Sequence, residues 1–198
     1  QAEAIELSLG GEDVCLATPT ASGKTLAFLA TGFDAVLRDP KARVLALYPA
    51  KALIHDQRGK WDSMAAQLNV RVGRIDGTVP VADRTAILSS CRIILMTPDV
   101  LHAWVMANTT QPAVAAFLRS VHVVVLDEAH VYDGVFGTNM AYLLRRFSAV
   151  ARAFRLMCAT ATIEEPEAFF QQLVGRTVRC IGPEQDGSAS HPKDVLLV

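Results

Sequence analysis

The chain has 198 residues and a formal net charge of −1 at pH 7, and 51% of its residues are hydrophobic. Its length predicts a single domain. No run of about 18 apolar residues is present, which excludes a membrane-spanning helix. The near-zero net charge excludes attraction to nucleic acid through a general basic field, so such binding would need local side chains or backbone amides.

The four cysteines are scattered along the chain, with no Cys-x-x-Cys pair. This spacing favours neither a zinc site nor a disulfide framework. Three of the four lie in or beside apolar runs, so we expect mostly buried, reduced thiols and a cytoplasmic location. The chain begins at Gln1 inside a helical pattern, with neither an initiating Met nor a secretory leader. We therefore expect it to be a piece of a longer protein.

Along the chain, short β-rich apolar runs alternate with longer helical patterns. Strands are predicted at residues 14–17, 44–48, 71–75, 93–97, 121–126, 155–159 and 177–181. Helices are predicted at residues 25–38, 50–68, 82–89, 98–107 and 140–153. This alternation predicts an α/β fold with a mostly parallel sheet, buried on both faces by helices. In such a sheet, ligands bind beyond the carboxyl ends of the strands.

The C-terminal stretch differs in composition from the rest. Residues 183–194 (PEQDGSASHPKD) are rich in Gly, Ser, Pro and charge, which is typical of a linker, and residues 195–198 (VLLV) resemble the start of a strand. We therefore assign residues 1–182 to one domain, 183–194 to an interdomain linker and 195–198 to the start of a second domain. We expect this final run to form a tail that leaves the compact body.

The sequence TPTASGKT at residues 18–25 follows the first predicted strand and opens a helix, which is the context of a phosphate-binding P-loop. Loop amides and a helix N-terminus would bind phosphate there. Gly23 permits close approach of the backbone, Lys24 reaches the β- and γ-phosphates, and the Thr25 hydroxyl is a predicted Mg²⁺ ligand. The alternative is an ordinary helix with Ser22 as its N-cap. The predicted nucleotide-binding residues of the loop are Thr20, Ala21, Ser22, Gly23, Lys24 and Thr25.

The sequence VVVLDEAH at residues 123–130 is an apolar strand that ends in two adjacent carboxylates. Asp127 is predicted to hold Mg²⁺ together with Thr25, while Glu128 orients and polarises the attacking water. Two solvated acids after a strand are the alternative, which the presence of the P-loop disfavours. Together the two patterns predict a site for a nucleoside triphosphate and Mg²⁺.

The DEAH sequence at residues 127–130 resembles the box of superfamily 2 helicases, and other motifs occur in the order of that family. Gln1 is similar to the glutamine that hydrogen-bonds adenine, and residues 48–53 (YPAKAL), 97–99 (TPD) and 159–163 (ATATI) resemble motifs Ia, Ib and III. The resemblance covers nearly the whole chain, up to about residue 182. It implies a RecA-like P-loop NTPase domain, the first of two in the parent chain, that binds ATP and Mg²⁺.

The resemblance also implies roles for single side chains in catalysis and coupling. His130 would sense the γ-phosphate or touch motif III, while Thr160 and Thr162 would connect the ATP site to the polynucleotide site. The catalytic residues that the resemblance implies are Lys24, Asp127, Glu128 and His130.

Four residues on the predicted carboxyl edge are candidates for contacts with a nucleic-acid backbone: Lys51, Gly77, Arg84 and Thr97. Gly77 and Arg84 fit the G-x6-R element of the family. Backbone contacts carry little sequence information, as a translocating motor requires. The alternatives are a solvated lysine at a helix start for Lys51, a helix-surface ion pair for Arg84 and a helix N-cap for Thr97.

The segment HVYDGVFGT at residues 130–138, followed by LLRR at 143–146, is similar to bacterial mitomycin-repair helicases and their archaeal and fungal relatives. This resemblance implies a 3′→5′ DNA helicase whose parent chain carries a cysteine-rich C-terminal domain, which these residues do not include. Asp133 stands where that branch has Arg. The contact that Arg makes there is therefore not expected in this chain.

The predicted function is that of a motor domain in an ATP-dependent DNA helicase or translocase, with single-stranded DNA as its partner. In the family a second RecA-like domain of the same parent supplies arginine fingers, so the isolated chain should hydrolyse ATP very slowly. Two alternatives are a DEAH-type RNA helicase and a nucleotide- or nucleic-acid-binding module without turnover. Residues 132–136 argue against the RNA helicase, and measured turnover would separate the enzyme from the module.

Overall fold

The computed structural model describes residues 1–18, 23–161, 163–182 and 184. Some of the predicted features lie outside these residues. They are Thr20, Ala21 and Ser22 of the P-loop, Thr162, most of the linker at residues 183–194 and the final run at residues 195–198.

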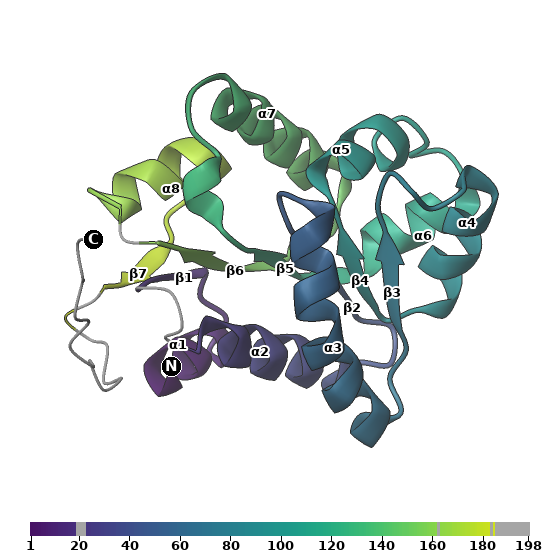
Figure 1. Cartoon of the computed structure of the whole chain (residues 1–198), viewed down its shortest axis with the longest axis horizontal. Helices are drawn as coiled ribbons and strands as arrows, with labels where there is room; N and C mark the ends of the chain where they lie inside the picture. Colours follow the sequence, from purple (N-terminus) through teal and green to yellow (C-terminus); the bar gives the residue numbers. More distant parts are fainter. Residues whose placement is uncertain (19–22, 162, 183, 185–198) are drawn as a thin grey trace, which may run out of the picture.

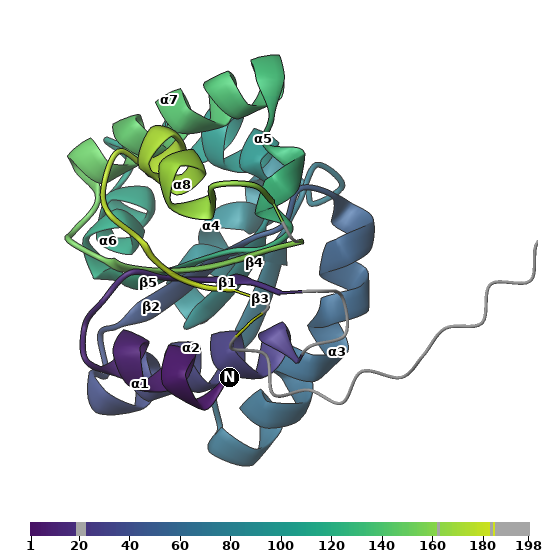
Figure 2. The same ribbon diagram turned by 90° about the vertical axis from the view of Figure 1, so that its left-hand side faces the viewer.

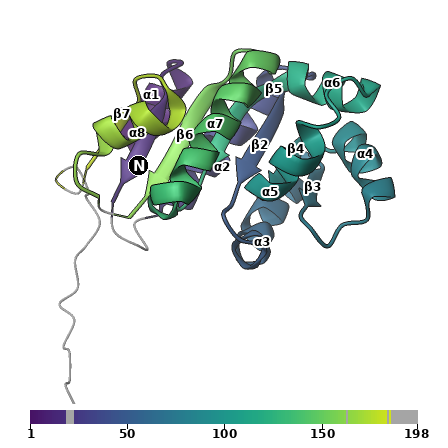
Figure 3. The ribbon, with the colours of Figure 1, turned by 90° about the horizontal axis from the view of Figure 1, so that it is seen from above.

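The described residues form one sheet of seven strands in which every neighbouring pair is parallel. Its strand order is β3-β4-β2-β5-β6-β1-β7, and the part from β3 to β6 can be followed by the labels in Figure 3. The carboxyl ends of all the strands therefore meet at one edge. The strands are β1 Val14–Ala17, β2 Arg43–Leu47, β3 Val72–Ile75, β4 Ile93–Met96, β5 Val121–Leu126, β6 Arg155–Thr160 and β7 Arg179–Ile181.

Helices cover both faces of the sheet, which confirms the predicted architecture (Figures 1 and 2). The helices α1, α2 and α3 lie on one face, and α4 to α8 lie on the other. Within the described residues, no helix is both long and apolar enough to cross a membrane. The helices are α1 Ala2–Leu9, α2 Lys24–Arg38, α3 Lys51–Leu68, α4 Val81–Ser90, α5 Pro98–Val100, α6 Pro112–Ser120, α7 Gly134–Val150 and α8 Pro166–Val174.

Strand side chains alternate between two hydrophobic cores, one on each face. In β2, Val44 and Ala46 join the core under α1 to α3, while Leu45 and Leu47 join the core under the opposite helices. All four side chains are fully buried. Successive residues of a strand point to opposite faces, so a strand covered on both sides is apolar throughout. This burial accounts for the continuous apolar runs in the sequence.

Two helices, α6 and α8, are not predicted by the periodic patterns. Each has nine residues and begins with a proline, Pro112 or Pro166. Proline is favoured at the first helical position because its missing N–H would have no partner there. The helix α8 also ends at Gly175, whose φ of 75° is typical of a glycine C-cap. The start and stop signals were therefore present, but the helices are too short for a clear period.

The start of α7 differs most from its predicted position. A helix is predicted at residues 140–153, whereas α7 begins at Gly134 and ends at Val150. Asp133 is its N-cap, and the carboxylate accepts a hydrogen bond from the Gly134 amide at 2.7 Å. Gly137 packs so closely on the Tyr132 carbonyl that a Cβ there would collide with the backbone oxygen. The glycine-rich segment that distinguishes the branch thus forms the first turns of this helix.

The predicted helix at residues 98–107 is also divided. The short helix α5 continues directly into a π-helical turn, η1 (Leu101–Val105). The remaining boundaries differ from the predicted ones by at most two residues.

Candidate nucleotide and nucleic-acid site

The carboxyl edge of the sheet divides into two halves. The neighbouring strands β5, β6 and β1 lead into the Asp127–Glu128 pair, the predicted motif III and the P-loop. The neighbouring strands β2, β4 and β3 lead into Lys51, Thr97 and Gly77. The halves meet between β5 and β2, where the Asp127 amide donates a hydrogen bond to the Leu47 carbonyl at 3.1 Å. The nucleotide candidates therefore lie beside the nucleic-acid candidates along one edge.

Lys24 is the first residue of α2, and its amine lies between two neighbouring strand ends. The Nζ atom donates to the Thr18 carbonyl after β1 at 2.7 Å and to the Thr160 carbonyl at the end of β6 at 2.8 Å. Thr160 is fully buried, and its hydroxyl has no hydrogen-bond partner among the described residues. The ammonium group thus stands at the N-terminus of a 15-residue helix, where the helix dipole also favours an anion.

Gln1 lies against the P-loop, although α1 and β1 separate the two in sequence. Gly23 is the N-cap of α2 and has a left-handed backbone with a φ of 73°, which glycine adopts at little cost. A Cβ at Gly23 would collide with the side-chain amide of Gln1. The structure therefore brings the predicted adenine-binding glutamine next to Gly23 and Lys24.

Asp127 follows β5 and has only 8% of its surface exposed. Burial raises the pKa of its carboxyl from the usual 3.8 to about 6. The Glu128 amide, which donates to Oδ1 at 2.9 Å, lowers this pKa, as do the ammonium groups of Lys24 and Lys60, while the negative charge of Glu128 raises it. A buried carboxylate of this kind is costly as an anion unless a cation compensates it.

Two residues of α3 that the sequence patterns do not single out also contact the site. The Thr25 hydroxyl donates to Gln57 Oε1 at 3.2 Å. Lys60 Nζ lies 3.0 Å from the same Gln57 oxygen and 3.5 Å from Thr25 Oγ1. The only signal in the sequence is that Gln57 and Lys60 share a helix face at a spacing of three residues.

The donor set at this position fits a magnesium ion. Mg²⁺ prefers oxygen ligands, often carboxylates, and keeps several waters. Thr25 offers a hydroxyl, and Asp127 offers a buried carboxylate whose charge needs compensation by a cation. A divalent cation held by these two oxygens would offset the cost of burying the Asp127 charge.

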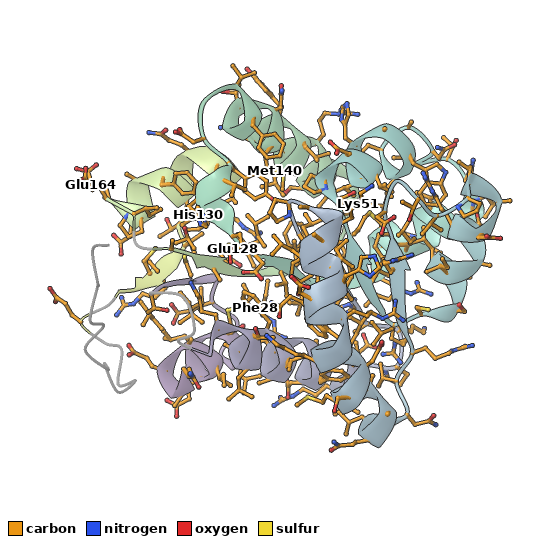
Figure 4. The ribbon with its side chains drawn as sticks, in the orientation of Figure 1. Phe28, Lys51, Glu128, His130, Met140 and Glu164 are labelled. Carbon is orange, nitrogen blue, oxygen red and sulfur yellow. The ribbon has the colours of Figure 1, made fainter. Side chains whose placement is uncertain are left out.

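Glu128 and His130 lie side by side near the end of β5, as Figure 4 shows. Glu128 has a φ of 50°, a left-handed conformation that is uncommon for residues with a Cβ. Its Oε2 lies 3.4 Å from His130 Nδ1, and the same nitrogen accepts a hydrogen bond from the Ala161 amide at 3.3 Å. A single ring nitrogen cannot both accept from Ala161 and donate to Glu128. His130 thus has two alternative partners, one of which belongs to the predicted motif III.

Lys51 and Thr97 follow adjacent strands in the other half of the edge. The Tyr48 amide donates to the Met96 carbonyl at 3.1 Å, which joins the two loops. Lys51 is the exposed first residue of α3, and Thr97 is the buried N-cap residue of α5. The Thr97 side chain makes no capping hydrogen bond. Its hydroxyl therefore gives no support to the N-cap alternative.

Gly77 and Arg84 lie farther along the same half. Gly77 is exposed in the turn after β3. Arg84, in α4, donates from Nε to the Val79 carbonyl at 3.0 Å, and its guanidinium stands 5.5 Å from the centre of the Trp104 ring. These contacts differ from the surface ion pair considered as the alternative for Arg84. The hydrogen bond ties Arg84 to the turn before α4, and the ring contact joins α4 to η1. A structural role for Arg84 therefore stands beside the predicted nucleic-acid contact.

The family to which the chain belongs follows from comparison with known proteins. The model of the DEAD/DEAH box helicase family matches residues 1–169. The chain belongs to this family. The ATP-dependent helicase hrq1 of Schizosaccharomyces pombe is 33% identical over 184 residues, which are 88% of this chain and 17% of that protein. The uncharacterized ATP-dependent helicase YprA of Bacillus subtilis is 29% identical over 193 residues, which are 94% of this chain and 25% of that protein.

Solved structures give the same result. The helicase MrfA bound to DNA and AMPPNP superposes with a TM-score of 0.86 and 27% identity over 94% of this chain and 27% of that chain. The predicted resemblance to superfamily 2 helicases of the mitomycin-repair type is thereby confirmed. The chain spans about a quarter or less of the length of these relatives.

One prediction concerns the cost of burying Asp127. Between pH 4 and pH 6 the folded state binds more protons here than the unfolded state, because burial raises the pKa of Asp127 to about 6. Stability attributable to this group therefore falls as the pH rises through that window. We expect Asp127→Asn to raise the free energy of unfolding by about 2 kcal/mol at pH 8. The gain should shrink towards zero near pH 4.

Urea unfolding at several pH values measures this effect. Asp56→Asn, at an exposed aspartate of α3, is the matched control and should not be more stable than the wild type at pH 8, because it removes no buried charge. A variant at Asp127 that is no more stable than the wild type at pH 8 would contradict a raised pKa of this carboxyl in the folded chain.

Proposed function

We propose that this chain is the ATP-binding motor domain of an ATP-dependent DNA helicase, which acts on single-stranded DNA in the cytoplasm. The observation that carries the proposal is the position of Lys24, whose amine bridges the ends of β1 and β6 near the buried carboxylate of Asp127. A Walker lysine, a metal-binding carboxylate and a water-orienting carboxylate are the parts that ATP hydrolysis requires. The four cysteines are free thiols, which agrees with a reducing compartment.

In the proposed mechanism, each polar side chain of the site has one task. Gln1 binds adenine, and Lys24, with the loop amides, binds the β- and γ-phosphates. Thr25 and Asp127 would hold Mg²⁺, which would neutralise the charge that develops on the phosphates. Glu128 orients the attacking water and accepts its proton.

Coupling between ATP and nucleic acid is proposed to run through the end of β6. Thr160 accepts a hydrogen bond from Lys24, and Ala161 donates one to His130. Both catalytic segments therefore touch adjacent residues of the predicted motif III, to which Thr162 also belongs. A movement of Lys24 or His130 would therefore change these hydrogen bonds to Thr160 and Ala161 directly. Such contiguous contacts are a physical route for coupling.

A second RecA-like domain of the parent chain is proposed to complete the catalytic site. An arginine finger supplied across the cleft accelerates related reactions by roughly 10³–10⁵. We therefore expect hydrolysis by the chain alone to be very slow, with or without DNA.

Two other functions have some support. Several ATP-dependent RNA helicases named RhlB match the chain at 29% identity, including that of Yersinia pestis, which covers 87% of this chain. Tighter binding to single-stranded RNA than to DNA of the same sequence would favour an RNA helicase. A binding module without turnover would bind ATP yet show no hydrolysis above the level of the Glu128→Gln variant.

A salt titration tests the nucleic-acid part of the proposal. Each phosphate of a single strand that the protein neutralises contributes about −0.7 to the slope of log affinity against log salt concentration. We expect Lys51→Ala to flatten this slope by about 0.7 for single-stranded DNA. Lys41→Ala, at an exposed lysine that precedes β2 at the opposite edge, should leave it unchanged. An unaltered slope for the Lys51 variant would mean that Lys51 is a solvated surface lysine that contacts no phosphate.

A further inference from the structure

A groove of about 320 Å³ lies between α5 with η1 on one side and α7 on the other. Tyr142 lines its α7 wall together with a row formed by Phe136, Asn139, Met140, Leu143 and Arg146. The residues of this row are spaced by three, one, three and three positions, so they form a single helical stripe that faces α5 and η1. Phe136, Leu143 and Arg146 belong to the segments that resemble the mitomycin-repair branch, but the proposed ATP chemistry gives none of them a role.

The floor of the groove is apolar and its rim is polar. Pro98, Met140 and Leu143 are buried beneath it. Arg146 donates from Nη1 towards His102 Nδ1 at 3.3 Å across the groove. Asp99, which is exposed, adds an acceptor to the rim. An apolar floor with a few convergent donors and acceptors is typical of a site for a flat, polar-edged ligand.

The groove also contains an exposed and supported aromatic ring. Phe136 is 43% exposed, and its ring packs against the buried ring of Tyr132 at a centroid distance of 5.3 Å. Tyr142, which is 61% exposed, lies at the same groove. Aromatic rings placed in this way are the stacking platforms of proteins that bind single-stranded nucleic acid. The neighbouring η1 is a π-helical turn, a rare conformation that is frequent at functional sites.

The groove adjoins the proposed path of the nucleic-acid backbone at Thr97. Pro98 and Asp99, which line it, follow Thr97 directly. Lys51 follows β2 and Thr97 follows the adjacent strand β4. Figure 4 shows Lys51 at the end of α3 that approaches α5. It also shows Met140 on the side of α7 that faces the centre of the molecule. The carboxylate of Asp99 would repel a phosphate but can accept a hydrogen bond from a base amino group. These side chains therefore favour the phosphate backbone of the DNA at Lys51 and Thr97 and a base of the DNA in the groove.

We propose that this groove receives one base of a single-stranded DNA, stacked on Phe136, while the adjoining phosphates lie against Lys51 and Thr97. The inference rests on the proposed function. It adds a contact that carries no charge and reads no sequence, because every base has a face that can stack. Such a contact suits a motor that must grip any sequence.

The test is fluorescence anisotropy with an end-labelled oligothymidylate. We expect Phe136→Ala to weaken binding by about tenfold or more, with an unchanged slope of affinity against salt because no phosphate contact is lost. Phe136→Tyr, which keeps the ring, should bind like the wild type. Val135→Ala is the matched control, since Val135 is its neighbour on α7, is 81% exposed and does not line the groove.

A second experiment identifies the residues that the base contacts. Photocrosslinking with an oligonucleotide that contains 5-iodouracil should modify a peptide at Phe136 or Tyr142. Equal affinity of the wild type and Phe136→Ala, with crosslinks elsewhere, would overturn the inference and leave this face to a protein partner. If Lys51→Ala still changed the salt slope in that case, the proposed function would stand. A wild type with no affinity for single-stranded DNA would overturn both.

Discussion

Replacing Lys24 with alanine is expected to weaken the binding of ATP by about 100-fold. The amine of Lys24 lies between the carbonyls of Thr18 and Thr160 and within electrostatic reach of Asp127. A charge-assisted hydrogen bond contributes more than a neutral one, and Lys24 would make such bonds to two phosphates. A fluorescent ATP analogue, titrated in the presence of Mg²⁺, gives both dissociation constants.

Lys41→Ala serves as the control for this experiment, because it removes an exposed lysine at the opposite edge of the sheet. Its affinity should equal that of the wild type. Equal affinity in the Lys24 variant as well would mean that Lys24 only ties two strand ends together. The free energy of unfolding would then fall in that variant without any change in nucleotide binding.

Glu128→Gln is expected to keep ATP binding and to lower hydrolysis by about 10²–10⁴, the usual contribution of a general base. Glutamine has nearly the shape of glutamate and can keep the left-handed backbone at this position, but it cannot accept a proton from water. Because the chain alone should hydrolyse slowly, the rate is best measured with radiolabelled ATP in excess of protein over long times.

Glu12→Gln is the matched control, since Glu12 is exposed just before β1, far from the carboxyl edge. It should hydrolyse ATP at the rate of the wild type. An equal rate for the Glu128 variant would remove Glu128 from the catalytic residues, and it would show that any measured hydrolysis arises elsewhere.

The alternation of strands and helices could be predicted because burial on both faces leaves continuous apolar runs between helical patterns. The start of α7 could not, since it depends on a cap at Asp133 and on the contact of Gly137 with a backbone carbonyl. Neither has a hydrophobic period. The helices α6 and α8 could not be predicted for the same reason. Proline marks the start of each, and glycine marks the end of α8, but neither is long enough to show a hydrophobic period.

The parts of the nucleotide site that are formed by short, continuous motifs could be predicted from the sequence. Contacts between distant segments could not, as Lys24 with Thr160 and Thr25 with Gln57 illustrate. The groove beside α7 could not be predicted for a further reason. Its residues have the spacing of an ordinary helix that faces the core, and only the fold shows that α5 and η1 lie opposite them.

The cysteines illustrate the same limit. Cys15, Cys158 and Cys180 are far apart in sequence, yet they lie in register on the adjacent strands β6, β1 and β7. Burial raises the pKa of the Cys15 and Cys158 thiols. Their apolar surroundings could be predicted from the strand-like runs, but their alignment required the order of the strands.

A titration of the wild-type chain with a fluorescent ATP analogue, in Mg²⁺ and again in EDTA, tests the ATP site most directly. We expect one saturable site from which unlabelled ATP displaces the probe. We also expect the affinity to be at least about tenfold lower in EDTA, because Asp127 and Thr25 would lose the ion that joins them to the phosphates. Absence of saturable binding, or binding that unlabelled ATP does not displace, would contradict the assignment of an ATP site at this edge of the sheet.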